Sequence, residues 1–178
     1  MITLASYYET FFKLGRAVLE MLGSIYQVPV EPADLEELRT NMLSMPAHED
    51  VPEGVGLLRE AGFRLMTLTN SPPDKDGSPL ERAGLAHFFE RQFRVDSVRR
   101  FKPAPEPYHL VTELLNVAPP AICLIAARTW DTLGAQSVGL SAGLVTRIGN
   151  APLPIHGLPQ PQVVATDLVR LARQMIAL

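Results

Sequence analysis

The chain has 178 residues, of which 47% are hydrophobic and 20% are charged, and its formal net charge is −3. This composition is typical of a single soluble globular unit and excludes a disordered or fibrous protein. The weak negative charge and the scattered arginines exclude an electrostatic surface for nucleic acid. No apolar run is long enough to span a bilayer and the amino terminus has no secretion signal, so we expect no membrane association and a cytoplasmic location.

The first part of the chain predicts an amphipathic helix. Residues 4–26 carry apolar side chains at helical spacing, with charged side chains between them. Phe11 and Phe12 lie on this helix, where the simplest interpretation is packing against another helix.

A second, shorter helix is predicted at residues 33–43, after Pro29 and Pro32 interrupt the first pattern. We expect the two helices to form a small unit, residues 1–48, ahead of a main domain at residues 49–178.

The main domain predicts strands that alternate with helices. The expected strands are residues 63–68, 93–98, 121–126 and 142–146, with a short edge strand at 163–164. The first expected helix begins at Pro52 and ends at Gly62. The other expected helices cover residues 78–84, 105–116, 132–138 and 167–176. The proline-rich segment at 149–161 is a loop, because proline cannot join a sheet interior. This alternation predicts an α/β fold with a doubly wound parallel sheet.

The only cysteine, Cys123, lies in the apolar run at residues 121–125. A single cysteine excludes an intrachain disulfide and a cluster of thiolate metal ligands. Reactive thiols need an exposed, electropositive setting, so we expect a buried structural thiol here.

Polar side chains follow successive strands of the predicted sheet. Thr69 and Asn70 begin a turn-rich run at residues 69–77, Lys102 follows the next strand, and Asp131 follows the apolar run that ends near residue 126. Alone, each has an ordinary structural explanation: turn formers, a solvated lysine, and a helix cap. Together they predict a site, because ligands of α/β sheets bind beyond the carboxyl ends of strands.

Three segments resemble motifs of the haloacid dehalogenase superfamily. Residues 68–70 (Leu-Thr-Asn) resemble its second motif, residues 101–108 (Phe-Lys-Pro-Ala-Pro-Glu-Pro-Tyr) its third, and residues 126–135 its fourth. The Lys-Pro-x-x-x-x-Tyr spacing and the Trp-Asp pair resemble the L-2-haloacid dehalogenase branch, whereas the phosphatase branch usually shows two acids in the last motif. The resemblance implies a core of this superfamily with a partial helical cap at residues 1–48.

The resemblance implies a two-step hydrolysis. An aspartate displaces halide from the substrate's C2 with inversion, and water then cleaves the resulting ester. In that scheme Thr69 and Asn70 hold the substrate's carboxyl group or the leaving halide. Lys102 balances charge on the nucleophile, and Asp131 orients Lys102 or the hydrolytic water.

The resemblance also assigns supporting residues. Tyr108 supports the site, and Phe11 and Trp130 match positions that wall an apolar pocket. Ala126 and Arg128 stand where the branch favours a serine and an asparagine; Arg128 either binds the anion in place of a cap arginine or is a plain solvent-facing or ion-paired residue. This branch needs no metal or other cofactor. The expected partner is a small 2-haloacid or another small carboxylate, and we expect a homodimer.

One family motif has no counterpart here. The nucleophilic aspartate of the family follows its first strand in an Asp-x-x-Gly-Thr motif, whereas Asp34 and Asp50, the first aspartates here, follow no apolar strand. That strand belongs between the strands that end at Leu68 and near Ile125. The gap then has three solutions: the two edges pair directly, another chain lends a strand, or residues 1–5 fill the place.

Three functions follow from this pattern. The first is a truncated dehalogenase-like hydrolase with nil or very weak activity, because lysine and one carboxylate do not replace the covalent nucleophile. The second is a non-catalytic family member that binds a small acidic molecule or is completed by another chain. The third, a Mg²⁺-dependent phosphatase-like activity, ranks last because it needs the same aspartate and more acids.

Overall fold

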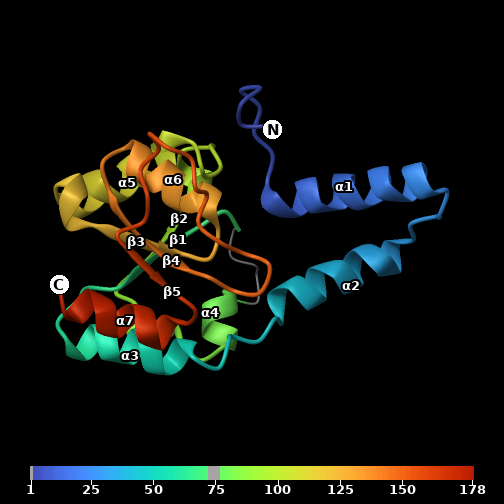
Figure 1. Cartoon of the computed structure of the whole chain (residues 1–178). Coiled ribbons are helices and arrows are strands. Elements are labelled where there is room, and N and C mark those ends of the chain that lie inside the picture. Colours follow the sequence, from blue (N-terminus) through green and yellow to red (C-terminus); the bar gives the residue numbers. More distant parts are fainter. Residues whose placement is uncertain (1, 72–76) are drawn as a thin grey trace.

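The computed structural model describes residues 2–71 and 77–178. Residue 1 and residues 72–76 lie outside the described residues. The second of these segments belongs to the expected turn-rich run at 69–77. Figure 1 shows a layer of strands between two layers of helices, with a two-helix arm at the amino-terminal end. No helix among the described residues has the length and apolarity needed to cross a membrane.

The arm consists of helices α1 (Phe11–Tyr26) and α2 (Pro32–Leu43), as the sequence predicts. Helix α1 begins later than expected, because residues 2–6 form turns and Ser6 adopts a left-handed conformation with φ of 61°. No residue of α1 is fully buried, although its apolar side chains lie along one face. The arm therefore stands beside the core rather than inside it (Figure 1).

The core follows the predicted alternation of strands and helices. Its elements are α3 (Val51–Glu60), β1 (Met66–Thr69), α4 (Pro79–Arg82), β2 (Arg91–Arg94), α5 (Pro105–Leu115), β3 (Cys123–Ala126), α6 (Thr129–Ser137), β4 (Ser141–Val145), β5 (Val163–Ala165) and α7 (Leu168–Ile176). The α/β fold class is therefore confirmed, with every described strand pair parallel.

Strand β2 differs from its prediction at residues 93–98. It begins two residues earlier, at Arg91, and ends at Arg94, where a 3₁₀ turn (Val95–Ser97) takes over. Val95 has no exposed surface, so this valine is buried by the turn rather than by the strand. Apolar residues at these positions fit a longer strand as well as a strand followed by a turn. The sequence pattern therefore does not show where the strand ends.

The strands form two separate sheets in the described part of the chain. One contains β1 and β2, and the other has the order β3–β4–β5. Direct pairing of β1 with β3 was one expected solution for the gap, and the structure contradicts it. Residues 2–5 lie in turns rather than a strand, so they do not fill the gap either.

Each face of the strand layer has its own apolar cluster. Helices α3 and α7 cover one face, where Val55, Leu168 and Leu171 pack together; Tyr108, Ala135 and Leu140 pack against the other face under α5 and α6 (Figure 1). This two-sided burial is typical of parallel sheets.

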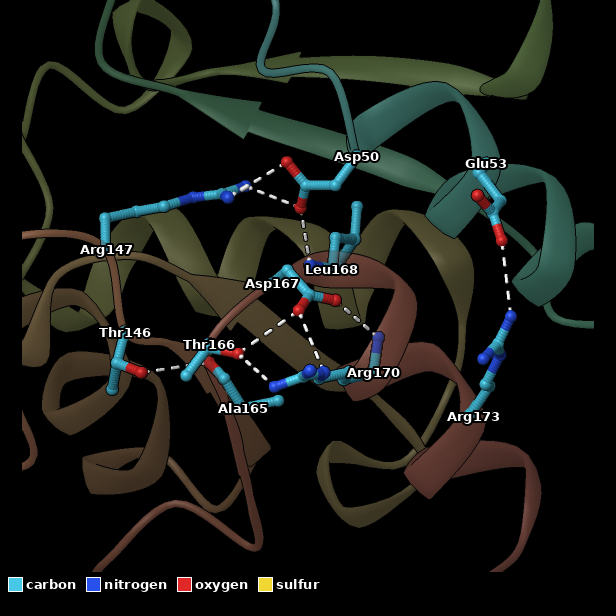
Figure 2. Close-up of polar contacts among 10 residues, drawn as sticks. All are labelled: Asp50, Glu53, Thr146, Arg147, Ala165, Thr166, Asp167, Leu168, Arg170 and Arg173. Carbon is cyan, nitrogen blue, oxygen red and sulfur yellow. Dashed lines mark hydrogen bonds and ion pairs between the residues drawn. The ribbon is translucent and has the colours of Figure 1, made fainter.

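Asp50 joins three elements at one end of the α3/α7 layer (Figure 2). Its carboxylate accepts two hydrogen bonds of 2.9 Å from the Arg147 guanidinium, and Oδ2 also accepts one of 2.6 Å from the Leu168 backbone N–H. Burial raises the pKa of Asp50, but the hydrogen bonds from Arg147 and Leu168 outweigh this, so the pKa lies below its usual value. Asp50 therefore links the start of α3 to the start of α7 and to the segment after β4.

Candidate functional site

Lys102 and Asp131 form a buried ion pair where strands β1 and β3 end. Lys102 Nζ lies 2.7 Å from Asp131 Oδ2, and the two side chains are 10% and 9% exposed. The same Nζ donates a 2.8 Å hydrogen bond to the carbonyl oxygen of Leu68, in strand β1. The predicted convergence of this lysine and this carboxylate is therefore present in the structure.

Tyr108, in α5, holds the other oxygen of the carboxylate. Its hydroxyl donates to Asp131 Oδ1 at 2.7 Å, and its side chain is fully buried. Burial, then the charge of Asp131 and this hydrogen bond, raise the pKa of Tyr108 above its usual value, because ionised tyrosine would lie beside a carboxylate. Tyr108 therefore acts as a hydrogen-bond donor that fixes the orientation of Asp131.

Asn70 and Thr69 shape the loop after β1. Asn70 Oδ1 accepts a 3.0 Å hydrogen bond from the backbone N–H of Lys102, which ties the two loops together. Thr69 Oγ1 accepts from the backbone N–H of Ser71 at 3.0 Å, as a turn-forming residue does. The oxygen of Asn70 is thus occupied in positioning Lys102, and the Lys102–Pro103 peptide bond is cis.

Gly134, in α6, permits the close packing behind this network. A Cβ atom at this position would lie 2.5 Å from the Tyr108 hydroxyl oxygen and 2.8 Å from Cβ of Pro103. Only glycine lets α6 approach Tyr108 so closely. Gly134 was missed as a site residue, although the small residues that follow Asp131 were the available signal.

The amino-terminal segment is attached directly before Lys102. Thr3 Oγ1 accepts a 3.2 Å hydrogen bond from the backbone N–H of Phe101, and the Tyr8 ring stacks on the Phe101 ring at 5.3 Å. The Tyr8 hydroxyl donates to Asp96, and burial together with this acceptor raises the pKa of Tyr8 to about 12. Residues 3–8 thus stabilise the loop that carries the lysine, a role that helical periodicity does not indicate.

A cavity of about 620 Å³ opens beside the ion pair, between strands β1 and β3. Lys102, Tyr108 and Asp131 line it, and almost all of its remaining lining is apolar. We call this space the β1–β3 groove. One end of the groove is polar and most of the remaining lining is apolar, which is the layout expected of a ligand pocket in an α/β protein.

The other predicted residues lie away from the lining of the groove. The Phe11 ring lies edge-on to the Phe12 ring at 5.9 Å, a contact within α1, so the predicted packing against another helix stays a prediction. Trp130 is 44% exposed and Arg128 is exposed at the start of α6. Their predicted roles in binding stay predictions, and the solvent-facing alternative for Arg128 agrees with its exposure.

No group of three or more His, Cys, Asp or Glu side chains within residues 2–71 and 77–178 is arranged to hold a metal ion. Cys123 lies in β3, where burial raises the pKa of its thiol to about 11. A high thiol pKa disfavours the reactive thiolate, so the expected structural role for this cysteine fits its setting.

Comparison with known proteins identifies the family of the chain. A family model described as a haloacid dehalogenase-like hydrolase matches residues 6–139, which is more than half of the chain. The chain belongs to this hydrolase family. Its fold agrees as well: the L-2-haloacid dehalogenase structure from Xanthobacter autotrophicus superposes with a TM-score of 0.86, at 22% identity, over 99% of this chain and 80% of that one.

Several curated relatives match this chain over part of their own length. (S)-2-haloacid dehalogenase 1 from Pseudomonas sp. (strain CBS-3) is 26% identical over 89% of this chain and 69% of its own length. (S)-2-haloacid dehalogenase from Xanthobacter autotrophicus is 33% identical over 57% of this chain and 41% of its own. A phosphoglycolate phosphatase from Colwellia psychrerythraea is 35% identical over 54% of this chain and 45% of its own. The chain thus spans less than half of the length of two of these relatives.

Proposed function

We propose that this chain is a haloacid dehalogenase-like hydrolase that binds small 2-haloacids or other small carboxylates at the Lys102 end of the β1–β3 groove. The buried Lys102–Asp131 pair carries this proposal. An ammonium group has three N–H donors, and here Leu68 O and Asp131 Oδ2 accept two of them. The third donor is suited to a carboxylate or halide that enters the polar end of the groove.

The low exposure of this pair favours an anion-binding role. Lys102 is 10% exposed, so its charge is poorly screened by water and acts strongly on a neighbouring anion. Asp131 and Tyr108 hold the lysine in one orientation, which reduces the cost of ordering it when a ligand binds. In this proposal Lys102 contacts the ligand, whereas Asp131, Tyr108 and Asn70 position Lys102.

We further propose that the 178-residue chain by itself has no more than very weak hydrolytic activity. Covalent hydrolysis needs a nucleophilic carboxylate at the substrate. Asp131 is the acidic residue in the groove lining, and Lys102 and Tyr108 bind its two oxygens. A carboxylate held in this way supports the lysine rather than attacking a substrate.

Halide release from L-2-chloropropionate tests the activity. The purified chain is expected to release halide no faster than buffer alone, and turnover clearly above that rate would contradict the proposal. Binding is measured separately, as the rise in melting temperature or the heat of titration with 2-chloropropionate. Lys102→Gln is expected to lose this signal, whereas Lys13→Gln, at an exposed lysine paired with Glu9, retains it. Circular dichroism confirms that both variants are folded.

A phosphatase-like activity is the last candidate, and its support is the 35% identity to a phosphoglycolate phosphatase over 54% of this chain. It predicts release of phosphate from phosphoglycolate in the presence of Mg²⁺. Phosphate release without halide release would favour this function over the first.

A non-catalytic role ranks ahead of the phosphatase-like activity. It predicts that the chain binds 2-chloropropionate and its halogen-free analogue propionate equally well, with no turnover of either. A preference for the halogenated acid would contradict it.

A further inference from the structure

Tyr8 joins the segment before α1 to the loop that carries Lys102. The Tyr8 ring stacks on the Phe101 ring, with centroids 5.3 Å apart and an angle of 27° between the two planes. The guanidinium carbon of Arg99 lies 4.9 Å from the centroid of the Tyr8 ring, within the range of a cation–π contact. One side chain therefore contacts two residues of the loop, and one of them directly precedes Lys102.

The Tyr8 hydroxyl fixes the direction of its ring. It donates a hydrogen bond to Asp96 Oδ1, in the 3₁₀ turn that follows β2. Burial, and then the hydrogen bond to Asp96, raise the pKa of Tyr8 to about 12, so the hydroxyl keeps its proton and remains a donor at neutral pH. Asp96 Oδ2 is buried and has no hydrogen-bond partner among the described residues, so the bond from Tyr8 matters for the stability of this carboxylate.

Thr3 makes a second attachment to the same loop. Its hydroxyl oxygen accepts from the backbone N–H of Phe101, and its carbonyl oxygen accepts from Arg100 Nη1, both at 3.2 Å. Together with the contacts of Tyr8, these bonds reach each of the three residues directly before Lys102. The position of the loop thus depends on residues 3–8.

The loop needs such support because its backbone is unusual at Arg99. This residue has a φ of 51°, a left-handed conformation that residues with a Cβ atom rarely adopt. A conformation of this kind persists only where the surrounding contacts hold it. The Tyr8 ring beside the Arg99 guanidinium is one of those contacts.

The position of Lys102 follows from the position of this loop. Its backbone N–H donates to Asn70 Oδ1 at 3.0 Å, and its side chain reaches Leu68 O and Asp131 Oδ2. A shift of the loop would move Nζ relative to both acceptors. It would also move the third N–H donor, which the proposed function assigns to the ligand.

We propose that Tyr8 is a positioning residue of the anion site: by holding Arg99 and Phe101, it keeps Lys102 oriented for a small carboxylate. Tyr8 does not line the β1–β3 groove, so it acts through the loop rather than by contact with the ligand. This role rests on the proposed function, because it concerns the affinity of that same site. The physical reason is preorganisation, since a lysine that is already ordered loses less conformational entropy when it binds.

Titration calorimetry with 2-chloropropionate tests this role in the intact chain. Tyr8→Leu removes the ring and is expected to bind about two- to tenfold more weakly than the wild type. Tyr8→Phe keeps the ring and is expected to recover most of that affinity. The matched control is Tyr7→Leu, at the neighbouring tyrosine, which is 71% exposed and is expected to bind as the wild type does. A purely structural role of Tyr8 would lower the melting temperature of Tyr8→Leu without changing its affinity.

A second measurement uses the wild-type chain and does not depend on the folding of Tyr8→Leu. Anion binding and order in the loop favour one another equally, because linkage is reciprocal. At about ten times its Kd, 2-chloropropionate is therefore expected to slow hydrogen exchange of the Phe101 amide, which donates to Thr3, by about tenfold. Lys102→Gln, without the anion-binding charge, is expected to show no such change.

Two results would overturn the role of Tyr8 and leave the proposed function intact. One is equal affinity of folded Tyr8→Leu and the wild type for 2-chloropropionate. The other is unchanged exchange of the Phe101 amide in wild-type chain saturated with this ligand. A wild-type chain that binds no 2-chloropropionate would instead overturn the proposed function, and the role of Tyr8 with it.

Discussion

Lys102 Nζ and Asp131 Oδ2 lie 2.7 Å apart, with both side chains almost fully removed from water. The lysine comes from the loop before α5 and the aspartate from the first turn of α6. Taking two charges out of water is costly, and the close contact offsets that cost only while both partners are present. The pair is therefore sensitive to the loss of either residue.

Asp131→Asn is expected to lower the free energy of unfolding by about 3–5 kcal/mol. Asparagine keeps the shape of the side chain but leaves the Lys102 cation without its counterion at 10% exposure. Urea denaturation followed by circular dichroism measures the loss. A change within 1 kcal/mol of zero, with an unchanged m-value, would show that the pair is hydrated in solution.

The coupling between the two residues is expected to appear in a double-mutant cycle. Lys102→Met combined with Asp131→Leu removes both charges, so the double variant loses less stability than the sum of the single losses, by about 0.5–3 kcal/mol. Unfolding of all four proteins under the same conditions gives this difference. Strictly additive losses would contradict a direct interaction.

Gly134→Ala is expected to destabilise the protein by about 1–3 kcal/mol, although alanine ordinarily favours a helix over glycine. The added Cβ would lie 2.5 Å from the Tyr108 hydroxyl and 2.8 Å from Cβ of Pro103. Tyr108→Phe removes the first of these contacts and is expected to recover part of the loss in the double variant. Thermal unfolding compares the variants, and Gly15→Ala, where nothing lies within 4 Å of an added Cβ, is the matched control.

Asp50 is expected to make stability depend on pH in the acid range. Its pKa is lowered in the folded state, so its contribution is fully present above the unfolded value of about 3.9 and is lost as pH falls through the folded value. Asp50→Asn should therefore be less stable than the wild type at neutral pH, with a smaller difference as the pH falls below about 4. Denaturant titrations at several pH values measure this, with Glu37→Gln, at an exposed carboxyl, as the control. A difference that is constant with pH would contradict the assigned role.

Cys123 is expected to react slowly with alkylating agents in the folded chain. Its thiol has a pKa of about 11 instead of 9.0, so at pH 8 it holds about a hundredfold less thiolate than an ordinary cysteine. Mass spectrometry after timed reaction with iodoacetamide measures the rate, and the same chain unfolded in urea is the reference. Equal rates in the two states would show that the thiol is exposed.

Much of the core was accessible to prediction because its signals are local. Apolar periodicity located α5, β3, β4 and α7, and the capping serine Ser78 was predicted for α4, where its hydroxyl accepts from the backbone N–H of Glu81 at 3.3 Å. The chain's family follows from three short motifs, and the family match confirms it. The division at residues 1–48 and 49–178, the homodimer and the cytoplasmic location stay predictions.

Errors arose where the decisive contacts are distant in sequence. The valine at position 95 fits either a strand or a turn, so β2 was placed too late. The small residues after Asp131 are visible in the sequence, but the Tyr108 hydroxyl that makes Gly134 necessary comes from a different helix, α5. The binding roles of Phe11 and Trp130 rest on the resemblance and stay predictions; neither residue lines the β1–β3 groove.

The sequence by itself determined that Asn70, Lys102 and Asp131 follow successive strands, because hydrophobic runs and turn residues mark the ends of those strands. It also predicts that the family's first-strand motif has no counterpart among these 178 residues. Only the tertiary structure decided that Tyr108 binds Asp131, that Asn70 binds the backbone of Lys102, and that β1 and β3 remain apart. These features depend on which strand edges pair and which side chains meet across the core, and such contacts are set by packing of the whole chain rather than by local preference.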